Sequence, residues 1–299
     1  MAVSDTRRNI LANKRYWLLT ILMFVLVGCS RQQQATNKLN VVTSVDFYAE
    51  VAKAVVGTHG HVHSVINDPA VDPHDFTPTV ADGKLVAQAD VVLANGAGYD
   101  SWMSKLTAAE PHVAVVSAAK VVGVHDGQNE HIWYNPTAMP KLANALAKQL
   151  SRSDPKHKAA YEKNAQRYIQ SLKPLLATID SLRAKQPGQL VAVSEPVFDN
   201  ALHYLGYQVA NPHFASAVEE GTDPSPADVK ALQSQVQAGK IRFFVRNTQV
   251  QSAIVDNAVA DAKQHGVPVL DVTETLPKHL TYTSWMTKQY HALAKILQQ

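Results

Sequence analysis

His74 is the first of two histidines whose sequence surroundings suit metal binding. It lies in the segment Asp72-Pro73-His74-Asp75, which follows an expected strand at residues 63–67. Ligands of open α/β sheets bind beyond the carboxyl ends of strands. Asp72 and Asp75 could accept a hydrogen bond from one ring N–H and leave the other ring nitrogen free for a metal ion. The competing interpretation is an Asp-Pro turn in which His74 is only a solvated loop residue.

The second histidine is His131, in the segment Glu130-His131-Ile132-Trp133-Tyr134-Asn135-Pro136. It precedes an expected helix at residues 136–150, so we expect it at another strand-to-helix junction of the same half of the chain. At that position its ring could share one site with His74. The alternative is a histidine that stacks against Trp133 near the surface.

Carboxylates take the corresponding positions in the second half of the chain. Glu195 comes directly after an expected strand at 190–194, and Asp271 ends another at 267–272, with Glu274 three residues later. A carboxylate at the end of a central strand needs a cation or hydrogen-bond donors. Glu195 could instead cap the following helix, and Asp271 or Glu274 could be turn residues.

Taken together, these positions predict a divalent metal site between the two halves of the chain. The imidazoles of His74 and His131 and the carboxylates of Glu195 and Asp271 suit a transition ion, and the absence of thiolate argues against a closed structural zinc site. Carboxylates that bind through both oxygens allow coordination above four, which favours Mn²⁺ over tetrahedral Zn²⁺.

The elements that must position these residues have an α/β pattern. From Leu39 onward, short β-rich runs alternate with longer helical patterns, which is typical of parallel sheets flanked by helices. We therefore expect two lobes, at residues 39–152 and 187–299, each with a roughly four-stranded parallel sheet. The expected strands are Leu39–Val45, His63–Asn67, Val91–Asn95, Val113–Ser117, Leu190–Ser194, Tyr207–Asn211, Arg242–Arg246 and Val267–Val272.

A single long helix is expected to bridge the lobes over residues 153–186. Ser153-Asp154-Pro155 is a helix start, because proline in the first turn lacks only an N–H that would be unpaired there. Apolar residues then recur at helical spacing as far as Arg183. Pro174 lies within this stripe and should kink or split the helix, since it removes one backbone hydrogen bond.

The N-terminus has the pattern of an export signal. Residues 1–28 carry Arg7, Arg8, Lys14 and Arg15 before an apolar run that ends at Gly28, and this run is shorter than the ~20 residues of a membrane-spanning helix. Leu-Val-Gly before Cys29 resembles the lipobox of bacterial lipoproteins. We therefore expect a lipidated Cys29, a flexible tether at 29–38, and an extracytoplasmic protein anchored to the bacterial cell membrane.

The net charge argues against nucleic acid as a partner, and the cysteine content excludes stabilisation by an intramolecular disulfide. Without residues 1–28, the Lys+Arg and Asp+Glu counts are equal, so the formal net charge is zero. Nucleic acid is therefore not expected as a partner, because phosphate binding needs a sustained basic excess. Cys29 is the only cysteine, so no intramolecular disulfide is available and stability must come from burial.

At the candidate ligands the sequence resembles the metal-binding receptors of zinc and manganese ABC importers, over nearly all of the chain after Cys29. The segments that carry the resemblance are Asp72–Thr79, His131–Pro136, Ser194-Glu195 followed by Phe198, Tyr204 and Gly206, and Val267–Pro277 followed by Tyr282, Trp285 and Met286.

The resemblance implies a monomeric solute-binding lipoprotein that is not an enzyme and delivers Mn²⁺ or Zn²⁺ to an ABC permease with its ATPase. It also implies two α/β lobes joined by one long helix. The implied ligands are His74, His131, Glu195 and Asp271, with Glu274 as the alternative to Asp271.

Two features depart from that family pattern. Where many zinc receptors have a long histidine- and acid-rich loop, only residues 125–130 remain. His59, His61 and His63 alternate, so they would share one face of an edge strand and could form an accessory site of low affinity or a solvated surface.

Two other functions compete with the receptor hypothesis. A secreted metal-dependent hydrolase could use the same ligands with an open position for water, but the chain has neither a His-Glu-x-x-His helix nor a Gly-x-Ser-x-Gly elbow. A surface adhesin is the other alternative, and host-cell binding that depends on the protein even when metal is replete would favour it.

Overall fold

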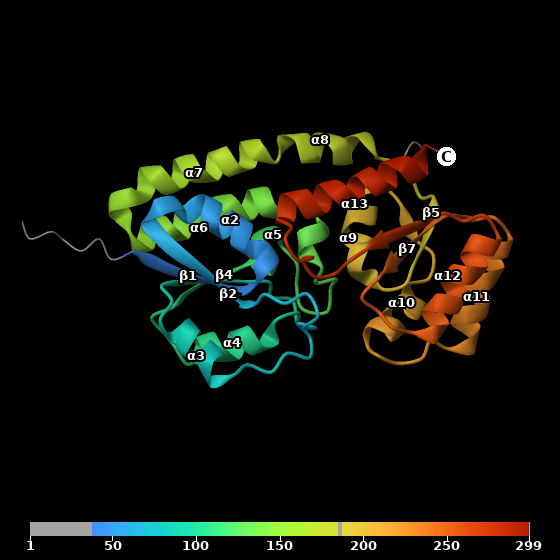
Figure 1. The fold of residues 1–299 in the computed structure, drawn as a ribbon, viewed down its shortest axis with the longest axis horizontal. Helices are drawn as coiled ribbons and strands as arrows, with labels where there is room; N and C mark the ends of the chain where they lie inside the picture. Colours follow the sequence, from blue (N-terminus) through green and yellow to red (C-terminus); the bar gives the residue numbers. More distant parts are fainter. Residues whose placement is uncertain (1–37, 185–186, 299) are drawn as a thin grey trace, which may run out of the picture. The chain divides into compact units, whose positions relative to one another are not determined.

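The computed structural model describes residues 38–184 and 187–298. The expected signal peptide, Cys29 and almost all of the tether lie outside these residues. The described chain contains two parallel four-stranded sheets, in the orders β2-β1-β3-β4 and β6-β5-β7-β8 (Figure 1). The strands are β1 (Leu39–Val45), β2 (Gly60–Ile66), β3 (Val91–Ala94), β4 (Ala114–Ser117), β5 (Leu190–Val193), β6 (Gln208–Val209), β7 (Ile241–Asn247) and β8 (Val269–Val272).

All eight expected strands are present, and the α/β prediction with two sheets is confirmed. Central strands form where the sequence is nearly continuously apolar, because both faces of a central parallel strand are covered. Thus β3 is buried at every residue, whereas the edge strand β2 exposes alternate residues. The edge strand β6 is shorter than predicted.

Helices cover both faces of each sheet. In Figure 1, α3 and α4 lie on the opposite side of the first sheet from α2, α6 and α7. The helices are α2 (Ala49–Val56), α3 (Val80–Ala87), α4 (Ser101–Ala108), α5 (Ala118–Val122), α6 (Ala138–Ser153), α7 (Lys158–Ser171), α8 (Lys173–Ser181), α9 (Asp199–Leu205), α10 (Pro212–Glu219), α11 (Pro226–Gln237), α12 (Ala253–Gln264) and α13 (Tyr282–Leu297). Short 3-10 helices are η1 (Asp46–Tyr48), η2 (Gly57–His59), η3 (Ile132–Tyr134), η4 (Pro155–His157) and η5 (Pro196–Phe198).

The expected bridging helix is divided in two. It consists of α7 and α8, which meet at Leu172, two residues before Pro174. The backbone still continues in a helical path across the junction, because Leu172 N donates to Tyr168 O and Leu176 N donates to Leu172 O. The break therefore follows from the missing N–H of Pro174, as the sequence predicts.

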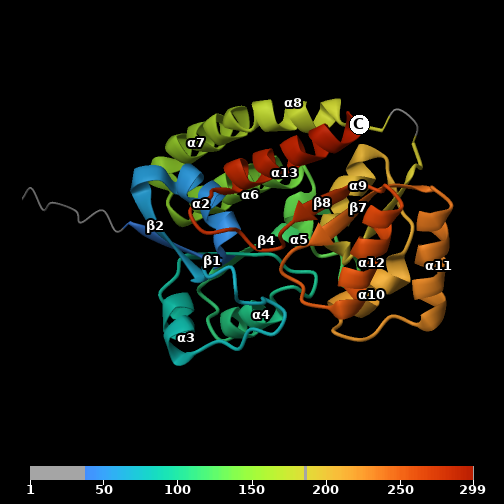
Figure 2. The same cartoon turned by 45° about the vertical axis from the view of Figure 1, so that its right-hand side comes forward.

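The C-terminal helix α13 is a second connection between the lobes, which we define as residues 38–153 and 187–281. It runs beside α8 in both views (Figures 1 and 2). At its start, Thr283 N donates to Glu50 Oε2 in the first lobe, and near its end Leu297 O accepts from Arg242 in the second. The sequence does not predict this role, because the apolar face of α13 has no feature that distinguishes it from an ordinary surface helix.

The hydrophobic core is continuous between the lobes. Alternation along β5 and β7 sorts their side chains: Val191, Val193 and Phe243 join the core of the first lobe, while Ala192 and Phe244 face a separate core under α10, α11 and α12. In residues 38–184 and 187–298, none of the helices combines the length and apolar character that membrane spanning requires. Extensive shared apolar packing makes a wide hinge motion between the lobes costly.

Candidate metal centre

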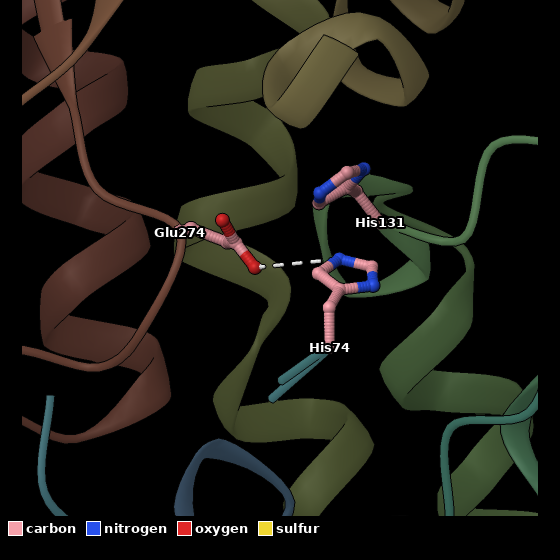
Figure 3. Close-up of side chains that lie close together, drawn as sticks. All are labelled: His74, His131 and Glu274. Carbon is pink, nitrogen blue, oxygen red and sulfur yellow. Dashed lines mark ion pairs between the residues drawn. The ribbon is translucent and has the colours of Figure 1, made fainter. Parts of the chain in front are cut away.

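Three of the expected ligands come together where the lobes meet. Ligand atoms of His74, His131 and Glu274 all lie within 4.8 Å of one another, and Figure 3 shows the three side chains converging from separate segments. His74 Nε2 lies 3.9 Å from Glu274 Oε1. The two histidines belong to the first lobe and Glu274 follows β8 in the second, so the cluster joins the lobes.

The loop after β2 fixes the position of His74. The backbone N–H of His74 donates to Asp72 Oδ1 at 2.8 Å, and Trp102 Nε1 donates to Pro73 O at 3.1 Å. The edge of one ring meets the face of the other between His74 and Tyr99, with centroids 4.9 Å apart. Asp72 therefore holds the backbone of His74 and not its ring, which corrects the expected role of this carboxylate.

His131 is placed as a neutral imidazole with one free nitrogen. Its side chain is 1% exposed, its Nδ1 lies 3.3 Å from Asn129 Oδ1, and its Nε2 is buried without a hydrogen-bond partner. Since the amide oxygen of Asn129 only accepts, the proton belongs on Nδ1 and the Nε2 lone pair faces the cluster. Burial and the charge of His74 lower the pKa of His131 to about 3, so the ring stays neutral near pH 7.

The surroundings of His131 differ from the sequence expectation. α5 and the loop after it separate β4 from His131, so the histidine follows a loop and does not lie directly at a strand end. The ring does contact Trp133, with centroids 5.2 Å apart, but it does so in the interior and not near the surface.

Glu274 is held by residues of both lobes. Its backbone N–H donates to Gln249 Oε1 at 2.7 Å, and Tyr99 OH donates to its Oε1 at 3.2 Å. Burial, followed by repulsion from Glu195 and Asp72, raises the pKa of the Glu274 carboxyl to about 8. A bound cation would reverse that effect, because it stabilises the ionised form.

Two acids that the sequence does not single out also reach this centre. Ligand atoms of Glu130 and Glu219 lie within 4.8 Å of each other and of one on His74, and His131 Nε2 is 3.5 Å from Glu219 Oε1. Burial and repulsion by neighbouring carboxylates, with Glu130 first, raise the pKa of Glu219 to about 9. Glu219 ends α10, so the rule that ligands follow strands could not find it. Glu130 precedes His131 and could have been found there.

Glu195 lies beside this centre, while Asp271 points elsewhere. The buried carboxylate of Glu195 accepts from Asn247 Nδ2 at 2.8 Å, and its charge helps to raise the pKa of both Glu274 and Glu219. Asp271 is exposed and forms a two-bond ion pair with Arg246, at 2.8 and 3.0 Å. In this structure the acid of residues 267–277 that reaches the cluster is therefore Glu274, the alternative, and not Asp271.

The donor set fits a divalent cation. Both His131 Nε2 and Glu219 Oε1 are buried without hydrogen-bond partners, and they face each other. Unpaired buried polar atoms are rare, because each carries an uncompensated desolvation cost. Neutral nitrogen and carboxylate oxygen around one space are the ligands that Mn²⁺ and Zn²⁺ accept.

Gln249 connects this centre to the loop before His74. Its Oε1 accepts from the N–H groups of Glu274 and Thr275, and its Nε2 donates to Pro69 O at 2.8 Å. We expect Q249A to weaken metal binding about tenfold, because loss of groups that orient ligands has effects of this size. Competition with a chelator checks this result, and unchanged affinity in a folded Q249A protein would contradict it.

The three alternating histidines do not share one face. His59 belongs to η2 and stacks on His157 with ring centroids 3.9 Å apart, while His61 and His63 are exposed on β2. The strand begins only at Gly60, so the alternation does not extend back to His59.

The sequence matches a known family and resembles curated relatives. The family profile described as ZnuA, zinc-uptake complex component A, periplasmic, matches residues 41–296. The metal ABC transporter substrate-binding lipoprotein ScbA of Streptococcus cristatus is 29% identical over 272 residues, 83% of each chain. The manganese ABC transporter substrate-binding lipoprotein scaA of Streptococcus gordonii is 30% identical over 275 residues, again 83% of each.

Solved structures share the fold. The SBP FpvC from Pseudomonas aeruginosa in complex with Mn²⁺ has a TM-score of 0.74 at 22% identity, covering 88% of this chain and 99% of that one. The periplasmic zinc-binding protein TroA from Treponema pallidum has a TM-score of 0.72 at 18% identity, covering 87% and 99%. With the profile matched over most of its length, the chain belongs to the family of the periplasmic zinc-uptake component ZnuA.

Proposed function

We propose that the chain is the extracytoplasmic substrate-binding protein of an ABC importer and captures a divalent transition metal for a membrane permease and its ATPase. Mn²⁺ is the favoured cargo and Zn²⁺ the next. His74 and His131 would bind the ion from the first lobe and Glu274 from the second, while Glu195 lies outside the two groups of ligand atoms that come within 4.8 Å of one another. Asp271, in its ion pair with Arg246, is assigned no part in binding.

A single observation carries this proposal. The fully buried Nε2 of His131 has no hydrogen-bond partner, yet it faces carboxylate oxygens contributed by a different lobe. A structural histidine would be paired, since burying an imidazole without partners on both nitrogens is costly. A neutral nitrogen kept free among acids is suited to a cation.

The relatives support the biological setting. They are named as metal or manganese ABC transporter substrate-binding lipoproteins, and the expected Cys29 anchor agrees with those names. We accordingly propose a monomer held at the outer face of the bacterial cell membrane by lipid on Cys29, after removal of residues 1–28. In the part of the chain that the structure describes, no feature of the centre favours the hydrolase or the adhesin alternative.

Metal titration tests the proposal. Protein freed of metal with a chelator should bind one Mn²⁺ or one Zn²⁺ per chain in competitive titration, and binding in weakly buffered solution at pH 7 should release protons. The release is expected because the Glu274 carboxyl, whose pKa lies at about 8, must ionise to bind an ion. A chain with no detectable affinity for either metal would refute the proposed function.

A further inference from the structure

The last residue of α10, Glu219, directs a carboxylate oxygen into the metal centre. Glu219 Oε1 is buried and has no hydrogen-bond partner, and it lies 3.5 Å from the equally unpaired Nε2 of His131. A separation of 3.5 Å is too long for a hydrogen bond between the two groups. The His131 side chain is 1% exposed, so bulk water does not satisfy its nitrogen.

The location of Glu219 is unfavourable unless a cation binds. The C-terminal end of a helix carries partial negative charge from its unpaired carbonyl groups, so an anion in the last turn is destabilised. The carboxylates of Glu130, Glu195 and Glu274 lie close enough to repel it further. Among the described residues no lysine or arginine forms an ion pair with Glu219; His131 alone does so by distance, and its ring is neutral.

The surrounding groups make an oxygen-rich set. His74 links two overlapping groups of potential ligands, one with His131 and Glu274 and the other with Glu130 and Glu219. His74 Nε2 is 3.9 Å from Glu130 Oε1 and also 3.9 Å from Glu274 Oε1. Because one nitrogen lone pair binds one ion, these two groups describe one crowded centre and not two independent sites.

Ligand number separates Mn²⁺ from Zn²⁺. Zinc in proteins is satisfied by about four ligands in a tetrahedron, while manganese prefers octahedral, oxygen-rich coordination by about six. Two imidazoles with Glu274 already supply three of the four ligands of a zinc site, so zinc needs at most one more. A further carboxylate ligand would therefore stabilise bound Mn²⁺, which prefers about six ligands, more than bound Zn²⁺.

We propose that Glu219 is a further metal ligand that determines specificity, because it extends the coordination shell in favour of Mn²⁺ over Zn²⁺. This inference rests on the proposed function. It assigns α10 of the second lobe a direct part in selecting the cargo.

The test compares E219Q with E220Q in the full chain without residues 1–28. Glu220 is the matched control, since it is the next residue and its side chain is exposed. Chelator competition should show that E219Q weakens Mn²⁺ binding at least about tenfold, weakens Zn²⁺ binding by less than about threefold, and that E220Q changes neither affinity. Glutamine keeps the shape of the protonated carboxyl and is always neutral, so E219Q should fold, which circular dichroism would check.

A second measurement does not depend on any variant. X-ray absorption at the manganese edge of the wild-type complex should give more than about four nitrogen and oxygen neighbours, and E219Q should reduce that number. Equal losses for both metals in E219Q, no loss at all, or four-coordinate manganese in the wild-type protein would each overturn the role of Glu219. Failure of the wild-type protein to bind either metal would instead refute the proposed function itself.

Discussion

Replacement of His131 by alanine is expected to weaken metal binding at least about a hundredfold, equivalent to about 2.7 kcal/mol. The variant removes a buried, unpaired imidazole nitrogen that faces the cluster, and the neighbouring imidazole, that of His74, already belongs to the expected ligand set. The ion would keep the carboxylates of Glu219 and Glu274 but would lose one neutral nitrogen ligand. Isothermal titration with Mn²⁺ and with Zn²⁺ measures the loss.

The matched control is H61A, because His61 is exposed on the edge strand β2. H61A should keep wild-type affinity, and metal should raise its melting temperature as it does for the wild-type protein. The melting temperature of metal-free H131A shows whether the variant is folded. Wild-type affinity in a folded H131A protein would exclude His131 as a ligand and with it the proposed centre.

The stability of the metal-free protein is expected to fall as the pH rises from about 6.5 to 9. The pKa of Glu274 is raised to about 8 and that of Glu219 to about 9 in the folded chain, against about 4.3 for an unperturbed glutamate. The folded state therefore binds more protons than the unfolded state in this window, and each unit of rising pH favours unfolding.

His131 defines the lower limit of that window. Its pKa is lowered to about 3 by burial, so the folded state binds fewer protons than the unfolded state between about pH 3 and 6.5, and His131 acts in the opposite direction there. Above pH 6.5 the acids act without this compensation. The loss of unfolding free energy up to pH 9 should be on the order of 5 kcal/mol, since each acid loses up to about 1.4 kcal/mol per pH unit below its folded-state pKa.

Urea denaturation at a series of pH values measures this effect. E219Q and E274Q should each flatten the curve and raise the stability of the metal-free protein above pH 7, since each removes one proton-binding group. Saturating Mn²⁺ should remove most of the decline, because the ion binds the carboxylates in their ionised form. A metal-free protein that becomes more stable from pH 6.5 to 9 would show that these acids are not destabilised.

The sequence was sufficient for the sheets because apolar patterning alone specifies them. The central strand β3 consists of valine, leucine and alanine, and β1 is rich in valine, while proline accounts for the junction at Leu172. The place of α13 across both lobes could not be predicted, since an amphipathic stripe shows that a helix is buried on one side but not what covers it.

Asp271 and Glu274 show how the alternation of side chains along a strand determines which acid can reach the site. Asp271 lies within β8, opposite Arg246 of β7 in the register, so its side chain stands on a sheet face. Its neighbours Leu270 and Val272 are buried while Asp271 is exposed. Glu274 lies beyond the strand, where the backbone is free to turn toward the lobe interface. Side chains alternate between the two faces of a strand, and applying this rule to residues 269–272 would have shown that Asp271 lies on the face opposite to that of Leu270 and Val272.

Glu219 shows where sequence reasoning ends. It ends an ordinary amphipathic helix, and its distance along the chain from His131 gives no indication that the two approach within 3.5 Å. Only the packing of α10 at the interface brings them together. A glutamate in the last turn of a helix is by itself only a weak indication of a functional role, although the helix dipole disfavours an acid there.

The direct bonds between the lobes have a consequence for import. Tyr134 OH donates to Thr273 O, Asn129 Nδ2 to Pro196 O, and Asn200 Nδ2 to His131 O. These bonds are made by protein groups alone, so cargo is not required to hold the lobes together. Empty and loaded receptors of this kind would have nearly the same outline, and a permease that recognises outline would accept both. Empty receptors would then compete with loaded ones for docking, so overproducing the receptor when metal is scarce would slow uptake.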